Sequence, residues 1–436
     1  MTRSYFPGLD LAEHYHGVMV LSLVTDARNL LDYDTGILVK GRIWDAWAAS
    51  ASQQELTDPE SRWHPVANFS QSGEAWECPA SLELFDGTCT LTLQENIGIR
   101  VHGGASRNYS QKSLSLFFRG RYGVDRLSYP LLPAAVDQNG EAITVYKSFL
   151  LRNGGNDREY LKFKDAMLQE LLSERRFAHQ AARPAILFLN GEYWGICTMC
   201  EKYGSTYLET HYPGIDRDNV VLIKDGKLDE GRPGDLALYE ELMGFAEEDL
   251  TFPAVWRNFK SLMDVESMAE YFAAEIYMGN ANWEGQHNIR LWRTRVPQNA
   301  NEYDDGRWRF LLYDTEYSSG LYGQQATSAP YDSFSAALSA HPLFAAAIQN
   351  PEFQSLFYDA IQSIGREDLS PARVDAALEE YSAQWQPFMA EYYLRFGDTG
   401  WAWNSNIDRI HTFFSERYDA ILAHIDTALP TLSAAG

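Results

Sequence analysis

The chain has 436 residues, of which 45% are hydrophobic and 14% aromatic, and its formal net charge is -24. This length allows a large buried core and two or three domains or lobes. The excess of acidic residues argues against nucleic acid or an anionic membrane as the main partner, because both repel a strongly negative surface. An anionic ligand would therefore need a local group of basic residues or a metal ion.

Membrane insertion and export leave no clear mark on the sequence. It contains no apolar run of 18 or more residues, so we expect no membrane span. The first ten residues, M-T-R-S-Y-F-P-G-L-D, lack the apolar core of a signal peptide, which leaves a cytoplasmic protein or the mature or excised part of an exported one.

Cys78 and Cys89 flank a predicted strand and are candidates for a disulfide. Cys197 and Cys200 are expected on opposite faces of one strand.

The first predicted element is the apolar run G-V-M-V-L-S-L-V at 17–24, which favours a buried strand. Loop-rich sequence follows, and we expect residues 1–80 to form an N-terminal β and loop extension. From Ser81 onward two β-rich runs are separated by Asp86-Gly87, a natural hairpin turn.

A glycine turn with basic residues comes next, in I-G-I-R-V-H-G-G-A-S-R-N-Y-S-Q-K-S-L-S-L-F-F-R. It predicts a strand, a turn at Gly103-Gly104 and a second strand over 113–119. Glycine lets backbone N–H groups approach a phosphate, and Arg107 and Lys112 add positive charge. The motif is neither a Walker A nor a G-x-G-x-x-G sequence, so a glycine hairpin with solvated basic residues is the alternative.

Two further elements follow in the β-rich half. A helix is predicted between Asp157 and Arg176, with Asp157 as its N-cap. The Asn190-Gly191 pair then joins two β-rich runs, which is the strongest short-range hairpin signal. Glu201 ends the second run, where it either pairs with Lys112 and holds that lysine over a phosphate or is surface charge.

The β-rich half ends with a predicted strand at 219–224 and an acidic, glycine-rich connection to about residue 236, the candidate hinge. Beyond it the pattern is helical. Apolar residues recur with helical spacing from Val265 to Tyr277, after Asp264 as N-cap.

The stretch from Asn280 to Tyr317 carries the chemistry. Its apolar runs 289–295 and 308–313 flank a polar loop and predict an antiparallel hairpin, which would set Asn288 beside Asp314. An amide oxygen and a carboxylate placed together, with Glu316 nearby, suit Mg²⁺. Protein kinases use this order of Asn, hairpin and metal-binding Asp. The alternative is an ordinary hairpin with polar ends.

Three amphipathic segments, 341–364, 371–395 and 405–429, complete the chain and predict a helical C-terminal part. The order of elements predicts an α+β protein with a bilobal, protein-kinase-like fold. We place the β-rich N-terminal lobe at 81–236 and the mainly helical C-terminal lobe, with the metal-binding hairpin, at 237–436.

Several stretches taken together resemble the CotH kinase family, an atypical, spore-coat-protein branch of the protein-kinase-like fold. The similarity spans most of residues 17–320. The stretches are G-I-R-V-H-G-G-A-S-R-N-Y-S-Q-K-S-L, L-R-N-G-G-N-D, F-L-N-G-E-Y-W-G-I, N-A-N-W-E-G-Q-H-N-I-R-L-W-R and W-R-F-L-L-Y-D-T-E-Y.

The resemblance implies ATP-dependent phosphorylation of Ser or Thr on a protein substrate, with Mg²⁺ or Mn²⁺ as cofactor. By position it assigns phosphate contacts to Arg107 and Lys112, and orientation of that lysine to Glu201. It assigns metal binding to Asn288 and Asp314. Catalysis would then rest mainly on positioning and electrostatic stabilisation.

One departure from the family pattern bears on activity. The loop before the hairpin has Asn282 where the family has Asp, with one extra residue around Gln286-His287. An amide cannot take up a proton and binds metal more weakly than a carboxylate. A weakened kinase or pseudokinase, substitution by Glu284, or an engineered change would each account for it. Glu316, where Asp is commoner, keeps the charge.

Three functions remain open at this point. The first is an active Ser/Thr protein kinase, and the second is a pseudokinase that acts as a binding module. The third is another chemistry on the same scaffold, such as nucleotidyl or amino-acid transfer, or a carbohydrate-binding surface. The acceptor protein, compartment and oligomeric state are not predicted.

Overall fold

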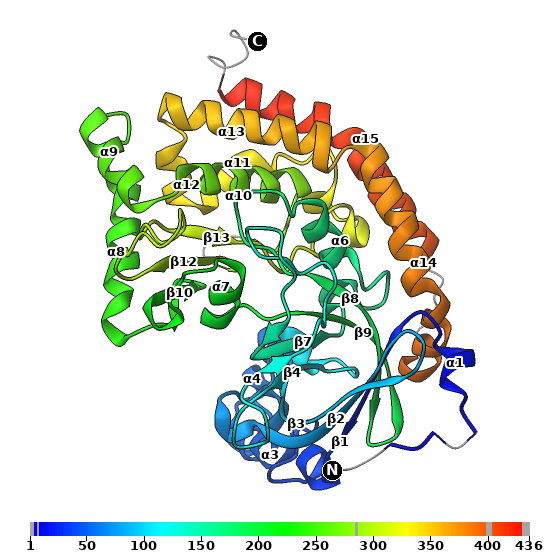
Figure 1. Cartoon of the computed structure of the whole chain (residues 1–436). Coiled ribbons are helices and arrows are strands. Elements are labelled where there is room, and N and C mark those ends of the chain that lie inside the picture. Colours follow the sequence, from blue (N-terminus) through cyan, green and yellow to red (C-terminus); the bar gives the residue numbers. More distant parts are fainter. Residues whose placement is uncertain (1–3, 7, 284–286, 398–402, 430–436) are drawn as a thin grey trace.

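A closed barrel of seven strands forms one end of the protein in the computed structural model, which describes residues 4–6, 8–283, 287–397 and 403–429 (Figure 1). The strand order around the barrel is β1-β2-β3-β4-β7-β9-β8. The strands are β1 (Met19–Val24), β2 (Cys78–Phe85), β3 (Leu91–His102), β4 (Ser113–Phe117), β7 (Ser148–Arg152), β8 (Ala182–Leu189) and β9 (Glu192–Glu201). Helices fill the other end, so the predicted α+β class is confirmed.

The N-terminal strand closes this barrel. β1 pairs with β2 in antiparallel and with β8 in parallel orientation. The predicted strand at 17–24 is thus confirmed, but the expectation of a β and loop extension is incomplete, because β1 belongs to the barrel. The β8–β9 hairpin is confirmed as well: Asn190 and Gly191 both adopt positive φ, 51° and 82°, as a tight hairpin turn requires.

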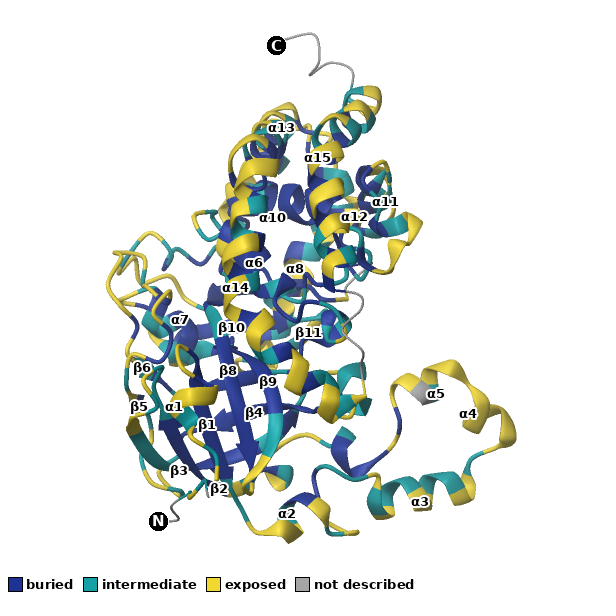
Figure 2. Ribbon diagram, turned by 90° about the vertical axis from the view of Figure 1, so that its right-hand side faces the viewer, coloured by how far each residue is buried: buried dark blue, intermediate teal, exposed yellow. Residues whose placement is uncertain are grey.

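Four short helices follow β1 where the sequence predicts loops: α2 (Ala27–Leu31), α3 (Gly41–Ser50), α4 (Gln53–Thr57) and α5 (Pro59–Trp63). Figure 2 shows α3 to α5 as a largely exposed arm that extends away from the barrel. The local signals are present in the sequence. Ser52 and Glu55 form a capping box, and Asp58 caps α5 with Pro59 in its first turn.

A second sheet lies between the barrel and the helices, with the order β11-β10-β12-β13. Its strands are β10 (Val220–Lys224), β11 (Lys227–Glu230), β12 (Arg290–Thr294) and β13 (Arg309–Leu311). The predicted hinge therefore contains β11, which pairs with β10, and the chain leaves the barrel after Glu201. The predicted hairpin of β12 and β13 is confirmed, with Arg290 opposite Leu311.

Ten α-helices of six to 26 residues come after β7 in the described part of the chain. They are α6 (Lys164–Leu171), α7 (Ser205–His211), α8 (Leu236–Gly244), α9 (Pro253–Leu262), α10 (Val265–Met278), α11 (Ser333–Ala340), α12 (Pro342–Ala347), α13 (Pro351–Ser363), α14 (Pro371–Phe396) and α15 (Trp403–Ala428). The Asp264 side chain caps α10 as predicted, by accepting from the Ser267 N–H. A short helix α1 (Leu11–His14) and a strand pair, β5 (Leu127–Ser128) with β6 (Val145–Tyr146), complete the elements.

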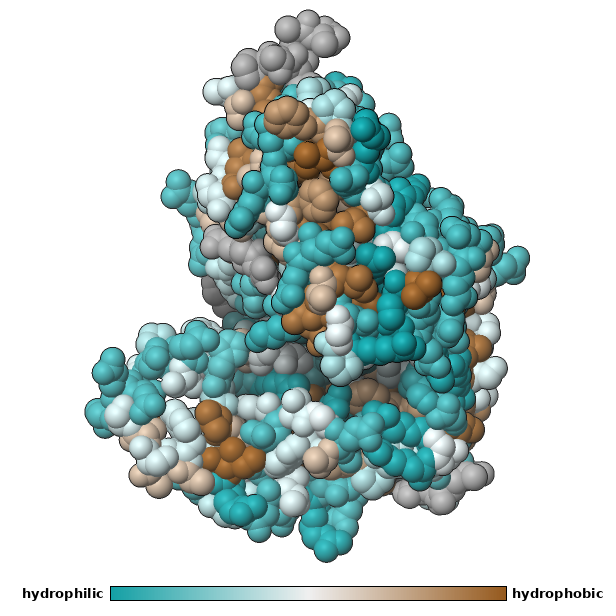
Figure 3. Space-filling view, turned by 90° about the vertical axis from the view of Figure 1, so that its left-hand side faces the viewer, coloured by the Kyte–Doolittle hydropathy of each residue, from teal (hydrophilic) through white to brown (hydrophobic). Residues whose placement is uncertain are grey.

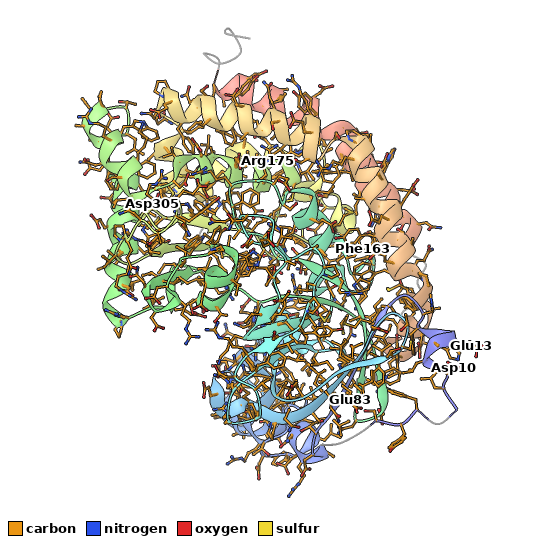
Figure 4. The ribbon with its side chains drawn as sticks, in the orientation of Figure 1. Asp10, Glu13, Glu83, Phe163, Arg175 and Asp305 are labelled. Carbon is orange, nitrogen blue, oxygen red and sulfur yellow. The ribbon has the colours of Figure 1, made fainter. Side chains whose placement is uncertain are left out.

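Helix α6 is shorter than predicted and begins after Phe163. Asp157 lies in a preceding 3₁₀ turn and accepts from the backbone N–H groups of Leu161 and Lys164, so it is not the N-cap. Phe163 packs against Trp385 of α14 and Trp403 of α15, with ring centroids 5.6 and 5.8 Å apart. Figure 4 shows Phe163 between the barrel end and α14.

Two large apolar cores hold these parts together. One fills the barrel with aliphatic side chains such as Leu21, Leu82 and Leu187, all fully buried. The other runs from the outside of β1 and β8 through α6 and α10 to α15. No helix in the described ranges is long and apolar enough to cross a bilayer.

The predicted disulfide is absent, since Cys78 and Cys89 are both free thiols. Cys78 begins β2 and Cys89 lies beyond its end, so the length of this eight-residue strand separates them. That length corresponds to roughly 25 Å, well beyond the reach of a disulfide.

Candidate functional site

A partly buried arginine joins three carboxylates where the barrel meets the second sheet. Arg152 is the last residue of β7. Its guanidinium pairs with Asp165 of α6 and donates to Asp314 Oδ1 at 2.7 Å and to both Glu316 carboxylate oxygens at 3.3 Å. Asp314 and Glu316 directly follow β13, so one side chain connects the barrel, α6 and the hairpin.

The backbone around this cluster fixes the acidic side chains. Asp314 has a φ of 61°, which turns the chain sharply after β13. Thr315 then donates from its backbone N–H and its hydroxyl to Asp165 Oδ1, both at 2.9 Å. Glu316 lies against Gly155, where an added Cβ would sit 1.9 Å from the carboxylate oxygen. The polar stretch L-R-N-G-G-N-D therefore makes room for Glu316.

Charge and burial strongly perturb this cluster. Burial raises the pKa of Glu316 well above its usual value, and the neighbouring Asp314 raises it further, while Arg152 opposes both. Burial alone would lower the pKa of Arg152, but Asp165, Glu316 and Asp314 together raise it well above normal. The guanidinium is thus always charged, and Glu316 binds a proton readily.

The loop that precedes the hairpin lies beside the Asp314–Tyr317 segment, because Ala281 N–H donates to the Tyr317 carbonyl at 2.9 Å. Asn288, with a φ of 55°, donates its side-chain N–H to the Asn282 carbonyl at 2.9 Å. The paired part of the hairpin ends at Arg290 and Leu311, so Asn288 precedes β12 by two residues and Asp314 follows β13 by three. Asn282, Asn288 and Asp314 are thus brought to one end of the hairpin. Glu284 lies outside the described residues.

A buried acid lies beneath this loop. Glu275 of α10 is 1% exposed and accepts from the Asn280 side chain at 3.0 Å. Burial raises its pKa to about 8, although hydrogen bonds from Asn280 and Tyr271 oppose the rise. Asp165 and Asp314 add to it, which indicates that Glu275 feels the charge of the Arg152 cluster.

Arg107 and Lys112 are held by backbone carbonyls near the glycine turn. Arg107 donates to the carbonyls of Phe69 and Gln71 at 3.1 and 2.7 Å. Lys112 is 6% exposed, donates to the Arg107 and Tyr109 carbonyls, and lies 4.1 Å from the Phe69 ring centre. Burial lowers the pKa of Lys112 to about 8. Both residues therefore stiffen the turn by tying it to the arm's C-terminal end.

Glu201 and Lys112 are not paired. Lys112 precedes β4, whereas Glu201 lies at the level of Phe149, beside the far end of β4. Glu201 instead contacts His211 Nε2 at 2.7 Å and accepts from Ala181 N–H. It is buried and not surface charge, so neither expectation for its side chain matches the structure.

Positive charge gathers on the barrel surface that faces the second sheet. The register places His102, Ser113 and Arg152 side by side on β3, β4 and β7. Burial lowers the pKa of His102 well below its usual value, and Lys202, Arg152 and Lys224 lower it further. In a chain of net charge -24, Lys202 and Lys224 thus add positive charge near Arg152, whose guanidinium is already paired with carboxylates.

A polar pocket of about 310 Å³ lies at the far end of the same strands, where β9 leads into α7. Its lining includes Phe117, Ser148, Lys202, Ser205 and Glu230. Figure 3 shows a hollow between the helical part above and the barrel with its arm below. A volume of this size falls at the lower end of the range for small-molecule sites.

The oxygen atoms of Asp314, Glu316 and Asn288 have the chemistry that Mg²⁺ or Mn²⁺ prefers. In the described part of the chain, however, no group of three His, Cys, Asp or Glu side chains is arranged to hold a metal ion. Arg152 accounts for this at Asp314 and Glu316, since its guanidinium already contacts both carboxylates. The donor set fits a cation that competes with Arg152.

The candidate site thus consists of Arg152 on a strand, Asp165 on a helix and Asp314 after a hairpin. The family model described as CotH kinase protein matches residues 99–421. The chain belongs to the CotH family. A search of curated proteins finds no match to the chain. The CotH match begins within β3, so β1, β2 and the arm lie outside it.

Sequence reasoning missed Arg152, Asp165 and Glu275. Arg152 stands at the end of an apolar run, S-F-L-L-R, which is the position of a strand residue that leaves the core. Asp165 falls in the first turn of α6, whose start was misplaced. Glu275 interrupts the apolar face of α10, and a charge at such a position was the available signal.

Proposed function

We propose that this CotH protein is a Ser/Thr protein kinase that transfers the γ-phosphate of ATP to a hydroxyl of a protein substrate, with Mg²⁺ or Mn²⁺. The barrel would be its N-terminal lobe and the helical part its C-terminal lobe, joined after Glu201. The observation that carries the proposal is the contact of Arg152 with both Asp165 and Asp314.

Protein kinases depend on an ion pair between a strand lysine and a helix glutamate, together with a metal-binding Asp after a hairpin. Here Arg152 of β7 and Asp165 of α6 have that relation, and Asp314 follows β13. An arginine can bind two phosphate oxygens at once through its planar fork. We therefore assign the strand cation to Arg152 and not to Lys112.

The remaining residues receive roles from their positions. Lys202, Lys224 and the neutral ring of His102 would face the negative triphosphate, and the pocket before α7 would take the nucleotide base. Asp314, Asn288 and Glu316 would hold the metal ion, which supplies charge neutralisation of the phosphates when bound. Gly103-Gly104 would let backbone N–H groups approach the phosphates.

A transfer assay with γ-labelled ATP, a Ser-rich acceptor and Mn²⁺ or Mg²⁺ tests this. We expect label in the acceptor, and a loss of about a hundredfold or more in Asp314→Asn, because the variant removes a carboxylate that acts on developing charge. Asp359→Asn on the exposed side of α13 is the matched control and should keep full activity. Label that survives Asp314→Asn would refute the proposal.

The second candidate, a pseudokinase that binds nucleotide without transfer, is favoured by one observation. Asn282 stands in the loop beside Asp314, where the family has Asp, and an amide cannot accept the proton of an acceptor hydroxyl. A rise in melting temperature with ATP and Mn²⁺, in the absence of transfer, would support it. Transfer that appears only in Asn282→Asp would identify an inactivated kinase.

A further inference from the structure

A second cavity, of about 290 Å³, lies within the helical part and shares no lining residue with the pocket before α7. Helices and strands from several parts of the chain form its walls. They include Tyr239 and Met243 of α8, Phe272 of α10, Leu291 of β12, Phe310 of β13 and Leu343 of α12. His341, between α11 and α12, brings an ionisable nitrogen group into the lining.

The size and chemistry of the cavity define its ligand. An apolar cavity of about 150 Å³ admits a benzene ring, so this volume suits a molecule of two fused rings. Among the residues that the structure describes, no carboxylate, ammonium or guanidinium group lines it. A charged ligand would lose its hydration without compensation there, so the ligand must be neutral. The aromatic rings in the lining, Tyr239, Phe272 and Phe310, favour an aromatic molecule over an alkyl chain.

The cavity wall supports the loop that holds Asn282. The His341 ring lies 4.1 Å from the Trp283 ring, and its Nε2 is 3.2 Å from the Trp283 carbonyl oxygen. Phe272 packs edge-to-face on Trp283 at 5.1 Å. Trp283 Nε1 in turn donates to the Tyr271 hydroxyl at 2.9 Å. A ligand against Phe272 and His341 thus touches two of the three residues named here that hold Trp283 in place.

The same cavity also adjoins both ends of the hairpin. Ile289 lines it and is the residue after Asn288, while Phe310 lies four residues before Asp314. Phe310 further stacks on Tyr271 at 4.3 Å. The candidate site residues of the helical part are therefore attached to backbone that forms the cavity wall.

We propose that this cavity is a binding site for a neutral, bicyclic aromatic molecule, and that its occupation stabilises the Asn280–Trp283 loop. The inference goes beyond the proposed kinase activity. Its readouts are binding and hydrogen exchange, so they are independent of whether the protein transfers phosphate.

The first experiment titrates the full chain with 2-naphthol and follows melting temperature and ligand fluorescence. We expect saturable binding at one site and a rise of about 2 °C at tenfold excess over the dissociation constant. Ala340→Phe, which fills the cavity from the end of α11, should weaken binding at least tenfold. Ala336→Phe, one turn earlier and outside the lining, is the matched control and should bind normally.

Equal affinity in Ala340→Phe and Ala336→Phe, or no saturable binding to the natural sequence, would overturn the assignment. Should Ala340→Phe not fold, Met243→Ala tests the same site. It removes part of the α8 wall and should weaken 2-naphthol at least fivefold, and unchanged affinity there would equally overturn the proposal.

The second experiment measures backbone hydrogen exchange with and without 2-naphthol. The amides of Ala281 and Asn282 donate to the Tyr317 carbonyl and the Asn280 side chain. We expect both to exchange at least threefold more slowly when the cavity is occupied, and the exposed amides of α4 to be unaffected. Binding without any slowing at these two amides would remove the link to the loop.

Discussion

The barrel and the second sheet both bury apolar side chains, such as Leu222 and Trp292 in the second sheet, but the second sheet buries charged groups among them. The barrel interior is aliphatic and aromatic, and Leu21, Leu82 and Leu187 are fully shielded from water. The second sheet instead buries Arg309 at 1% exposure, paired with Asp264 and Asp305, and carries Asn288 and Asp314 at its strand ends. Burial of apolar side chains stabilises the barrel. In the second sheet, part of that stabilisation is offset by the cost of burying polar groups in fixed positions.

The largest loss of stability is expected from a charged substitution in the barrel interior. Leu21→Asp would bury an unpaired carboxylate at the centre of β1, which costs more than about 5 kcal/mol, comparable to the whole stability of a domain. We expect no cooperatively folded protein in urea denaturation followed by circular dichroism. Leu91→Asp, at an exposed position of β3, should change stability by less than about 0.5 kcal/mol. A folded Leu21→Asp protein would contradict this account of the barrel.

The Arg152 cluster gives the next largest effect. Arg152→Met leaves three carboxylates facing one another and should lower the free energy of unfolding by about 3–5 kcal/mol. Millimolar Mn²⁺ should recover part of the loss, because a cation replaces the guanidinium. Arg175→Met breaks another buried pair, with Asp368, and is the control that Mn²⁺ should not rescue. Equal rescue of both variants would argue against a metal site at Asp314.

Glu275 should make the free energy of unfolding depend on pH. Its pKa in the folded protein, about 8, exceeds the usual value of 4.5, so the folded state binds the proton more tightly. The stabilisation that protonation of Glu275 contributes is complete below pH 4.5. It is lost as the pH rises from 4.5 through 8. Glu275→Gln should therefore lose about 3 kcal/mol less than the natural sequence between pH 5 and 8.

Chemical denaturation at several pH values measures this difference. Glu266→Gln, exposed on the same helix, serves as control and should follow the natural sequence. Parallel pH profiles for Glu275→Gln and the natural sequence would show that the carboxyl is not perturbed.

The smallest effect concerns the barrel's hairpin turn. Asn190 has a φ of 51° and its side chain accepts from the Thr25 N–H at 2.8 Å. Asn190→Ala should cost about 1–2 kcal/mol, because alanine resists positive φ and loses the hydrogen bond. Asn190→Gly keeps the conformation and should cost less. A larger loss for glycine than for alanine in thermal melts would contradict this reasoning.

Local signals made much of the fold predictable. The Asn190-Gly191 turn, the Asp264 cap and the apolar runs of the hairpin each act within a few residues, and the structure confirms all three. The pairing of β1 with β8 joins residues about 160 positions apart and has no local signature. The Ser52–Glu55 capping box is a further local signal, at the start of α4.

The candidate site was predictable only in its second half. Asn288 and Asp314 flank the two strands of one hairpin, so their position at the same end of it follows from the antiparallel pairing. Arg152 meets Asp314 across 162 residues, and no periodicity connects them. The predicted pairing of Lys112 with Glu201 failed for the same reason, since the two residues end neighbouring parts of the barrel at opposite levels.

The parallel pairing of β1 with β8 also sets an order of events during synthesis. β1 and β2 can pair as soon as residue 85 has emerged, but the other edge of β1 has no partner until residues 185–189 follow. At typical rates of chain elongation, this leaves an apolar strand edge open for about 5–20 seconds. Such an edge invites pairing with another chain. The nascent barrel is therefore the stage at which this protein is most exposed to aggregation, and a chaperone that covers β1 would act there.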